Sequence, residues 1–251
     1  MTCCIARCEL PAKKASMSRK TGLFSIVLIV FTLFGSCVFN DDVARSASRG
    51  EIRQFAAGAA IDPSMAERRT ISAYDAMMRR IAREEGLDWL LMSAIAYNES
   101  RFESDLISNQ GAIGLMQVMP RVGKQFNVEK EHLTDPETNI RLAGRILKKI
   151  DATLKLGAAA SEDDRMSIIL ACYNGGIGHV SDARRLARNN GEDPNSWEVV
   201  VRYLHKKADP EVYESELVRC GKFTGSRRTE AYVRDVMKRY DTYREMTAKR
   251  Q

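Results

Sequence analysis

The chain has 251 residues, enough for one medium-sized domain with additional segments or for two small domains. Hydrophobic residues make up 44% and charged residues 29%, which is typical of a globular protein and excludes a chain that is disordered throughout. The formal net charge of +6 becomes +2 for residues 37–251, because most of the excess Lys and Arg lies in residues 1–36. This weak charge predicts no nucleic-acid partner.

An apolar segment, TGLFSIVLIVFTLFGS, covers residues 21–36 and directly follows Arg19 and Lys20. Its length and its charged start are typical of a signal peptide. Small residues before Cys37 look like the lipobox of bacterial lipoproteins, so we expect Cys37 to be lipidated and to become the first mature residue. A plain signal peptide and an uncleaved membrane anchor stay open, although the segment is short for a membrane-spanning helix. Each of these alternatives exports the rest of the chain.

The sequence divides into three parts. Residues 1–36 are assigned to the signal-peptide region, and translation is expected to begin at Met17, which opens a conventional charged start. Residues 37–70 are weakly patterned and are expected to form the lipidated cysteine and a polar tether. Residues 71–247 are expected to form a single helical domain.

Local patterns from residue 71 onward predict a succession of helices. Gly86 is expected to end the first, and Asp88 to cap the second, DWLLMSAIAYNES, which is apolar on nearly every side and therefore buried. Asp135 followed by Pro136 should open another. Further helices are predicted at MSIILACYN, VSDARRLARNN, NSWEVVVRYL and TEAYVRDVMKRYDTYREM. The predicted fold class is mainly α, with at most a small β-hairpin near Gly111.

Glu99 ends the helix that is predicted to be most buried, and the glycine-punctuated segment GAIGLMQVMP, residues 111–120, follows it. Burial raises the pKa of a carboxyl group, and a carboxylic acid that stays protonated near neutral pH can act as a general acid. The glycines allow close backbone approach to a ligand. Met116 and Gln117 add an apolar side chain and an amide, a mixture that suits a sugar ring. A Glu at a helix end is usually solvated, so Glu99 alone proves little.

Four motifs in order resemble the lytic transglycosylases of the soluble-transglycosylase, goose-lysozyme-like group. They are Asn98-Glu99-Ser100, Ser108, GAIGLMQVMP and ACYNGG of residues 171–176. Downstream segments, including EVYESELVRCGKFTG and EAYVRDVMKRY, are similar to the catalytic domain of the membrane-bound lytic murein transglycosylase F type. The resemblance covers roughly residues 76–247. It implies a fold of the lysozyme-like α+β superfamily, here mainly helical, with a substrate cleft.

The resemblance implies an enzyme that cleaves the β-1,4 bond between N-acetylmuramic acid and N-acetylglucosamine in peptidoglycan strands without consuming water. Glu99 would protonate the glycosidic oxygen, and would then take the proton of the muramyl C6 hydroxyl as that oxygen closes a 1,6-anhydro ring. Tyr173 matches a position that supports this glutamate, and Tyr232 a position that lines the cleft. The implied substrate-side residues are Ser108, Met116, Gln117, Tyr173, Asn174 and Tyr232. No cofactor or metal is implied.

Two alternative functions stay open. A lysozyme-type hydrolase on the same scaffold would need a second carboxylate to position water, for which Glu103 and Asp105 are the candidates. The segment that contains them, FESD, lacks the proline that the family usually has there. A catalytically silent murein-binding lipoprotein is the other alternative. The expected location is the cell envelope, facing the periplasm, with the lipid in the outer membrane. The resembled branch often carries a solute-binding-like domain before the catalytic one, and we expect the short tether to leave no room for it.

Several further side chains are expected to have ordinary roles. The histidines, His132, His179 and His205, are not spaced as a ligand cluster. The pairs Arg184-Arg185 and Lys206-Lys207 are expected on solvated faces. A disulfide between Cys172 and Cys220 is possible in an oxidising compartment, but the sequence cannot bring the two thiols together, so their pairing stays open.

Overall fold

The computed structural model describes residues 70–248. The predictions for the signal-peptide region, Cys37 and the tether lie outside these residues. Helices make up 65% of the described part, which contains isolated β-bridges but no β-strand. The predicted mainly helical class is therefore confirmed. No helix in this part of the chain is long and apolar enough to cross a membrane.

The first helix ends, and the second begins and ends, where the local patterns predict. Helix α2 (Asp75–Glu85) stops at Gly86, whose φ of 66° is left-handed and whose N–H donates to the carbonyls of Ala82 and Arg83. Helix α3 (Trp89–Ser100) starts after Asp88, whose carboxylate accepts from the Leu90 N–H at 2.7 Å. Because α3 is apolar on most sides, it lies in the core of the domain.

The middle of the domain consists of a loop and three further elements: α4 (Pro120–Lys124), the 3₁₀ helix η1 (Lys130–Thr134) and α5 (Pro136–Leu154). Asp135 caps α5 by accepting from the Thr138 N–H at 2.8 Å, as predicted. One apolar stripe of α5 is buried; its members are Ile140, Ala143, Leu147, Ile150 and Leu154. This stripe holds α5 against its neighbours α2 and α6.

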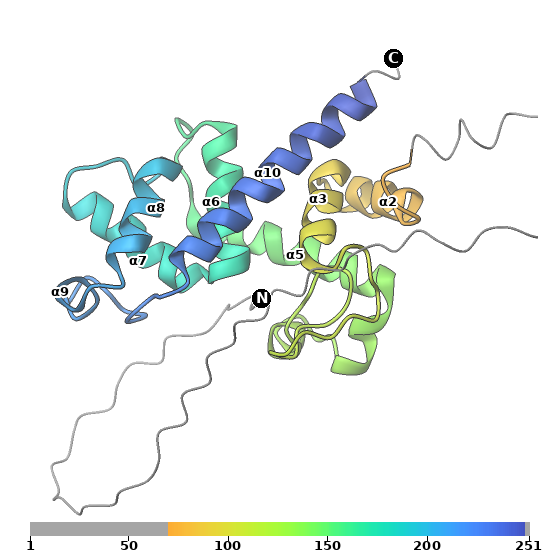
Figure 1. Ribbon diagram of the computed structural model, residues 1–251, viewed down its shortest axis with the longest axis horizontal. Coiled ribbons are helices and arrows are strands. Elements are labelled where there is room, and N and C mark those ends of the chain that lie inside the picture. Colours follow the sequence, from red (N-terminus) through yellow and green to blue (C-terminus); the bar gives the residue numbers. More distant parts are fainter. Residues whose placement is uncertain (1–69, 249–251) are drawn as a thin grey trace, which may run out of the picture. The chain divides into compact units, whose positions relative to one another are not determined.

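The remaining helices are α6 (Glu162–Gly175), α7 (Ile177–Asn189), α8 (Trp197–Lys206), α9 (Pro210–Tyr213) and α10 (Ser226–Ala248). Helix α6 starts before the predicted MSIILACYN because the Ser161 hydroxyl accepts from the Asp164 N–H at 3.1 Å and caps it there. Helix α10 runs alongside α3, α6 and α8 (Figure 1). It therefore brings residues near the end of the chain next to the end of α3.

Two expectations about side chains were wrong. Arg184 is only 7% exposed and donates to the Leu154 carbonyl at 2.7 Å, while Lys207 is fully buried and pairs with Asp182 at 2.7 Å. In each of the two pairs of adjacent basic residues, one side chain points inward. Its burial is tolerated because it has a buried polar partner. Cys172 is a buried free thiol, so the disulfide with Cys220 that the sequence left open does not form in this structure.

Candidate active site

Glu99 occupies the last turn of α3 and is half-buried. Burial raises the pKa of its carboxyl from the ordinary 4.5 to about 7, and the hydroxyl of Tyr232, a hydrogen-bond donor to this carboxyl, opposes the rise. The negative end of the α3 dipole also disfavours the carboxylate at this position. The group can therefore both hold and release a proton near neutral pH.

The end of α3 turns sharply into the loop that follows. Arg101 and Phe102 both have positive φ, 56° and 68°, which is uncommon for residues other than glycine. The buried hydroxyl of Ser100 contacts the carbonyls of Ala96, at 3.2 Å, and Leu115, at 2.8 Å. Ser100 thus fastens the helix turn that carries Glu99 to the glycine-containing loop.

Asn139 on α5 anchors that loop, and the sequence reasoning missed it. Its side-chain oxygen accepts from the Met116 N–H at 2.7 Å, and its amide nitrogen donates to the carbonyls of Ile113 at 3.0 Å and Leu133 at 2.8 Å. Asn139 is fully buried. The only signal in the sequence was a polar residue inside an apolar helix face, and no motif marks it.

Gln117 and Ser108 lie in the same loop, and both brace its backbone. Gln117 is 2% exposed, and its amide nitrogen donates to the carbonyls of Leu106 and Gly114, each at 3.0 Å. The half-buried Ser108 accepts from the Ala112 N–H at 3.0 Å. These contacts give both side chains a structural role, and the substrate-side role implied by the resemblance stays a prediction.

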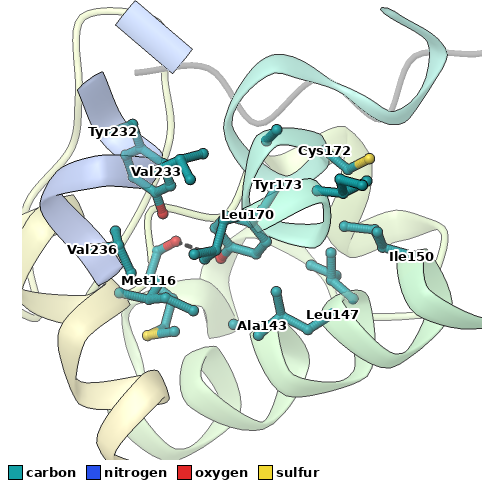
Figure 2. Close-up of a cluster of buried hydrophobic side chains, with 14 of the residues drawn as sticks. Met116, Ala143, Leu147, Ile150, Leu170, Cys172, Tyr173, Tyr232, Val233 and Val236 are labelled. Carbon is teal, nitrogen blue, oxygen red and sulfur yellow. Dashed lines mark hydrogen bonds between the residues drawn. The ribbon is translucent and has the colours of Figure 1, made fainter. Parts of the chain in front are cut away.

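Tyr173 on α6 holds the same loop through a hydrogen bond. Its buried hydroxyl donates to the Met116 carbonyl at 2.8 Å (Figure 2). Figure 2 also shows Tyr232 of α10 in the same cluster, together with side chains of α5. Asn174, the next residue along α6, accepts from the Thr229 hydroxyl of α10 at 3.0 Å. Glu99, Met116, Tyr173 and Tyr232 therefore come together from four separate parts of the chain.

The two candidates for a second catalytic carboxylate are more exposed than Glu99. Glu103 and Asp105 are both exposed on the loop after α3, and the Glu103 N–H donates to the Ser100 carbonyl at 3.1 Å. Neither shares the burial that raises the pKa of Glu99. Within residues 70–248, no group of three or more His, Cys, Asp or Glu side chains is arranged to hold a metal ion.

The comparisons with known proteins agree with one another on the family that this chain resembles. Residues 76–196 match the Transglycosylase SLT domain. A membrane-bound lytic murein transglycosylase F of Alteromonas mediterranea is 33% identical over 195 residues, which cover 77% of this chain and 40% of that protein. The protein of the same name from Stutzerimonas stutzeri is 36% identical over 140 residues, covering 56% of this chain and 28% of that one.

Among solved structures, the 70 kDa soluble lytic transglycosylase of Escherichia coli is 25% identical with a TM-score of 0.48, covering 70% of this chain and 24% of that one. The chain spans less than half the length of each of the two transglycosylase F relatives named above. Residues 76–196 are therefore similar to the transglycosylase SLT domain family, the family to which the names of these relatives also point.

Proposed function

We propose that the protein is a peptidoglycan lytic transglycosylase. It cleaves the β-1,4 bond between N-acetylmuramic acid and N-acetylglucosamine and leaves a 1,6-anhydro-muramyl end. The observation that carries this proposal is Glu99, a carboxyl in the last turn of the buried helix α3 whose pKa burial raises to about 7, against the opposing influence of the Tyr232 hydroxyl. The relatives named lytic murein transglycosylase F support the choice of substrate.

Glu99 serves as both acid and base in the proposed reaction. In its protonated form it donates to the glycosidic oxygen, and the bond to the muramyl C1 breaks. The resulting carboxylate takes the proton of the muramyl C6 hydroxyl, whose oxygen attacks C1 and closes the ring. Because one group performs both transfers, a pKa near the working pH suits both steps. The nucleophile belongs to the substrate, so no second carboxylate is needed.

The other site residues of this proposal come from the loop after α3, from α6 and from α10. Tyr173 holds the loop through the Met116 carbonyl, and the Tyr232 hydroxyl lowers the pKa of Glu99. The proposed substrate-side set is Ser108, Met116, Gln117, Tyr173, Asn174 and Tyr232. Residues 71–247 are proposed as the catalytic domain.

The test is mass spectrometry of the sugars that the protein releases from purified peptidoglycan. We expect products lighter by one water than hydrolysis products, ending in 1,6-anhydro-muramic acid. Glu99→Gln should lower the rate by at least about a hundredfold, because general acid–base catalysis typically contributes 10²–10⁴. Glu103→Gln, which alters an exposed carboxylate four residues later, is the matched control and should keep most of the rate.

Other outcomes would select other functions. Reducing ends that require Glu103 or Asp105 would indicate a lysozyme-type hydrolase. Wall binding without any released sugar, unchanged by Glu99→Gln, would indicate a silent murein-binding protein.

We propose in addition that Cys37 carries a lipid that holds the domain at a bacterial membrane, the inner leaflet of the outer membrane being the preferred location. The small residues before Cys37 and the membrane-bound relatives support this. Labelling of growing cells with a radioactive fatty acid should mark the full-length protein, and Cys37→Ser should abolish the label and release the protein from the membrane fraction. Retention of label in the variant would contradict the assignment.

A further inference from the structure

A pocket of about 160 Å³ lies where α6 ends and α10 begins. Asn174 and Gly175 line it from α6, and Arg228 and Thr229 from α10. Arg228 precedes Tyr232 by four residues, so the two side chains leave the same face of α10 with Cβ atoms roughly 6 Å apart. The pocket therefore lies about one helix turn along α10 from Tyr232, whose hydroxyl acts on the Glu99 carboxyl.

Glycine keeps the pocket open. A Cβ at Gly175 would lie 2.9 Å from the Thr229 hydroxyl oxygen and 3.1 Å from Cζ of Phe223, so any other residue there would press on this wall. The Phe223 ring stacks on the His179 ring, with centroids 4.4 Å apart and planes at 26°. These two rings form another side of the pocket.

His179 presents a hydrogen-bond donor. Its Nδ1 lies 3.0 Å from the Lys207 ammonium, which can only donate, so Nδ1 accepts and the proton of the neutral ring is on Nε2. Burial and then the Lys207 charge lower the His179 pKa to about 4, which keeps the ring neutral at physiological pH. Lys207 is itself fixed by Asp182 at 2.7 Å, with both side chains buried. The tautomer is thus set by the core of the domain.

The other polar groups of the pocket are also donors. Asn174 is 7% exposed and its oxygen accepts the Thr229 hydroxyl, which leaves its amide nitrogen with no partner among the described residues. Arg228 is exposed and forms no ion pair with any residue of 70–248. The positive end of the 23-residue helix α10 lies at the same place. No carboxylate from residues 70–248 lines the pocket.

We propose that this pocket binds a carboxylate on the lactyl-peptide arm of a muramic acid residue. This inference rests on the proposed function, which supplies the glycan strand. The sugar rings of such a strand carry neutral hydroxyl and acetamido groups, so they would leave Arg228 uncompensated. Its acidic groups are the carboxylates of the peptide stem and, where the stem is absent, of the lactyl group. The arm of a sugar bound beside Glu99 reaches the pocket one helix turn away along α10.

Binding measurements on the full-length protein carrying Glu99→Gln test this, because that variant should leave its ligands intact. Three ligands of equal length are titrated: muramyl strands with peptide stems, the same strands after an amidase has removed the stems, and N-acetylglucosamine oligomers. For each muramyl ligand, its Kd is divided by that of the neutral oligomer. Adding Arg228→Gln should raise this ratio about tenfold for the ligand whose carboxylate is bound. Arg227→Gln, also exposed but outside this pocket, should change it less than twofold.

The outcomes separate the sources of the carboxylate. A rise only with stem-bearing strands identifies a stem carboxylate, and a rise only with stripped strands identifies the lactyl carboxylate. An unchanged ratio for both, an equal effect of Arg227→Gln, or no binding of either muramyl ligand overturns the proposal. Failure of the proposed function shows differently: the protein with Glu99 intact would release no 1,6-anhydro product while the Arg228 effect on binding persisted.

Discussion

The carboxyl of Glu99 is subject to two opposing influences. Burial stabilises its protonated form, while the Tyr232 hydroxyl stabilises the carboxylate by donating to it. The resulting pKa of about 7 predicts that the general-acid step declines above neutral pH, because the proton that must be donated is lost there. The pH at which the rate declines therefore reports the surroundings of Glu99.

Tyr232→Phe should therefore move the alkaline limb of the kcat/KM profile upward. Removing the donor leaves burial unopposed, so the Glu99 pKa rises and the acid form persists to higher pH. We expect a shift of about 0.5–1 unit, the size of one ordinary hydrogen bond. Tyr240→Phe is the control, since its hydroxyl donates to Asp88 and not to Glu99. A downward shift in Tyr232→Phe would show that the hydroxyl does not stabilise the carboxylate.

At the scale of elements, the loop between α3 and α4 is shaped by how closely it approaches η1 and α5. Gly111 and Gly114 have nearly equal φ, 82° and 81°, yet their surroundings differ. A Cβ at Gly111 would meet open space, whereas one at Gly114 would lie 2.5 Å from the Leu133 carbonyl and 2.7 Å from the Asn139 amide nitrogen. Only Gly114 is required for packing as well as for backbone conformation.

This pair of glycines gives a matched prediction for stability. Gly111→Ala should lower the free energy of unfolding by about 1 kcal/mol, the cost of a left-handed conformation with a side chain. Gly114→Ala should lower it by roughly 3 kcal/mol or more, because the Asn139 contacts must also shift. Urea denaturation of both variants measures the difference. Equal losses would mean that the loop moves away from Asn139 without penalty.

Across the whole domain, a buried charge pair connects α7, the end of α8 and the segment that leads into α10. Asp182 accepts from the Lys207 ammonium and from the backbone N–H groups of Arg219, at 3.0 Å, and Cys220, at 2.8 Å. The Phe223 N–H donates to the Lys207 carbonyl at 3.1 Å. This cluster fixes the start of α10, and α10 in turn carries Tyr232 to Glu99.

Lys207→Met should destabilise the domain by about 3–5 kcal/mol, because Asp182 stays buried without its main counter-charge. Lys206→Met, one residue earlier and exposed, should change the free energy of unfolding by less than about 0.5 kcal/mol. Denaturant titrations of the two variants make the comparison. A loss below about 1 kcal/mol in Lys207→Met would show that Arg185 and the backbone donors are sufficient for Asp182.

The sequence by itself determined most of the longer helices and several of their ends, because a cap is a contact between residues at most a few positions apart. Gly86, Asp88 and Asp135 could be identified in this way, and so could the glycine-punctuated loop after Glu99. The motif that contains Glu99 also pointed to the family, since its order and spacing are properties of the chain. The raised pKa followed from an apolar helix that had to be buried.

Only the tertiary structure decided which polar side chains lie inside. Asn139 contacts Met116 across 23 residues, and Lys207 reaches Asp182 across 25 and His179 across 28. Local periodicity cannot distinguish such residues from solvated ones, because what makes their burial tolerable is a partner from another helix. For the same reason, the sequence pattern wrongly predicted Lys207 and Arg184 at the surface. The pocket beside His179 could not be predicted from the sequence either.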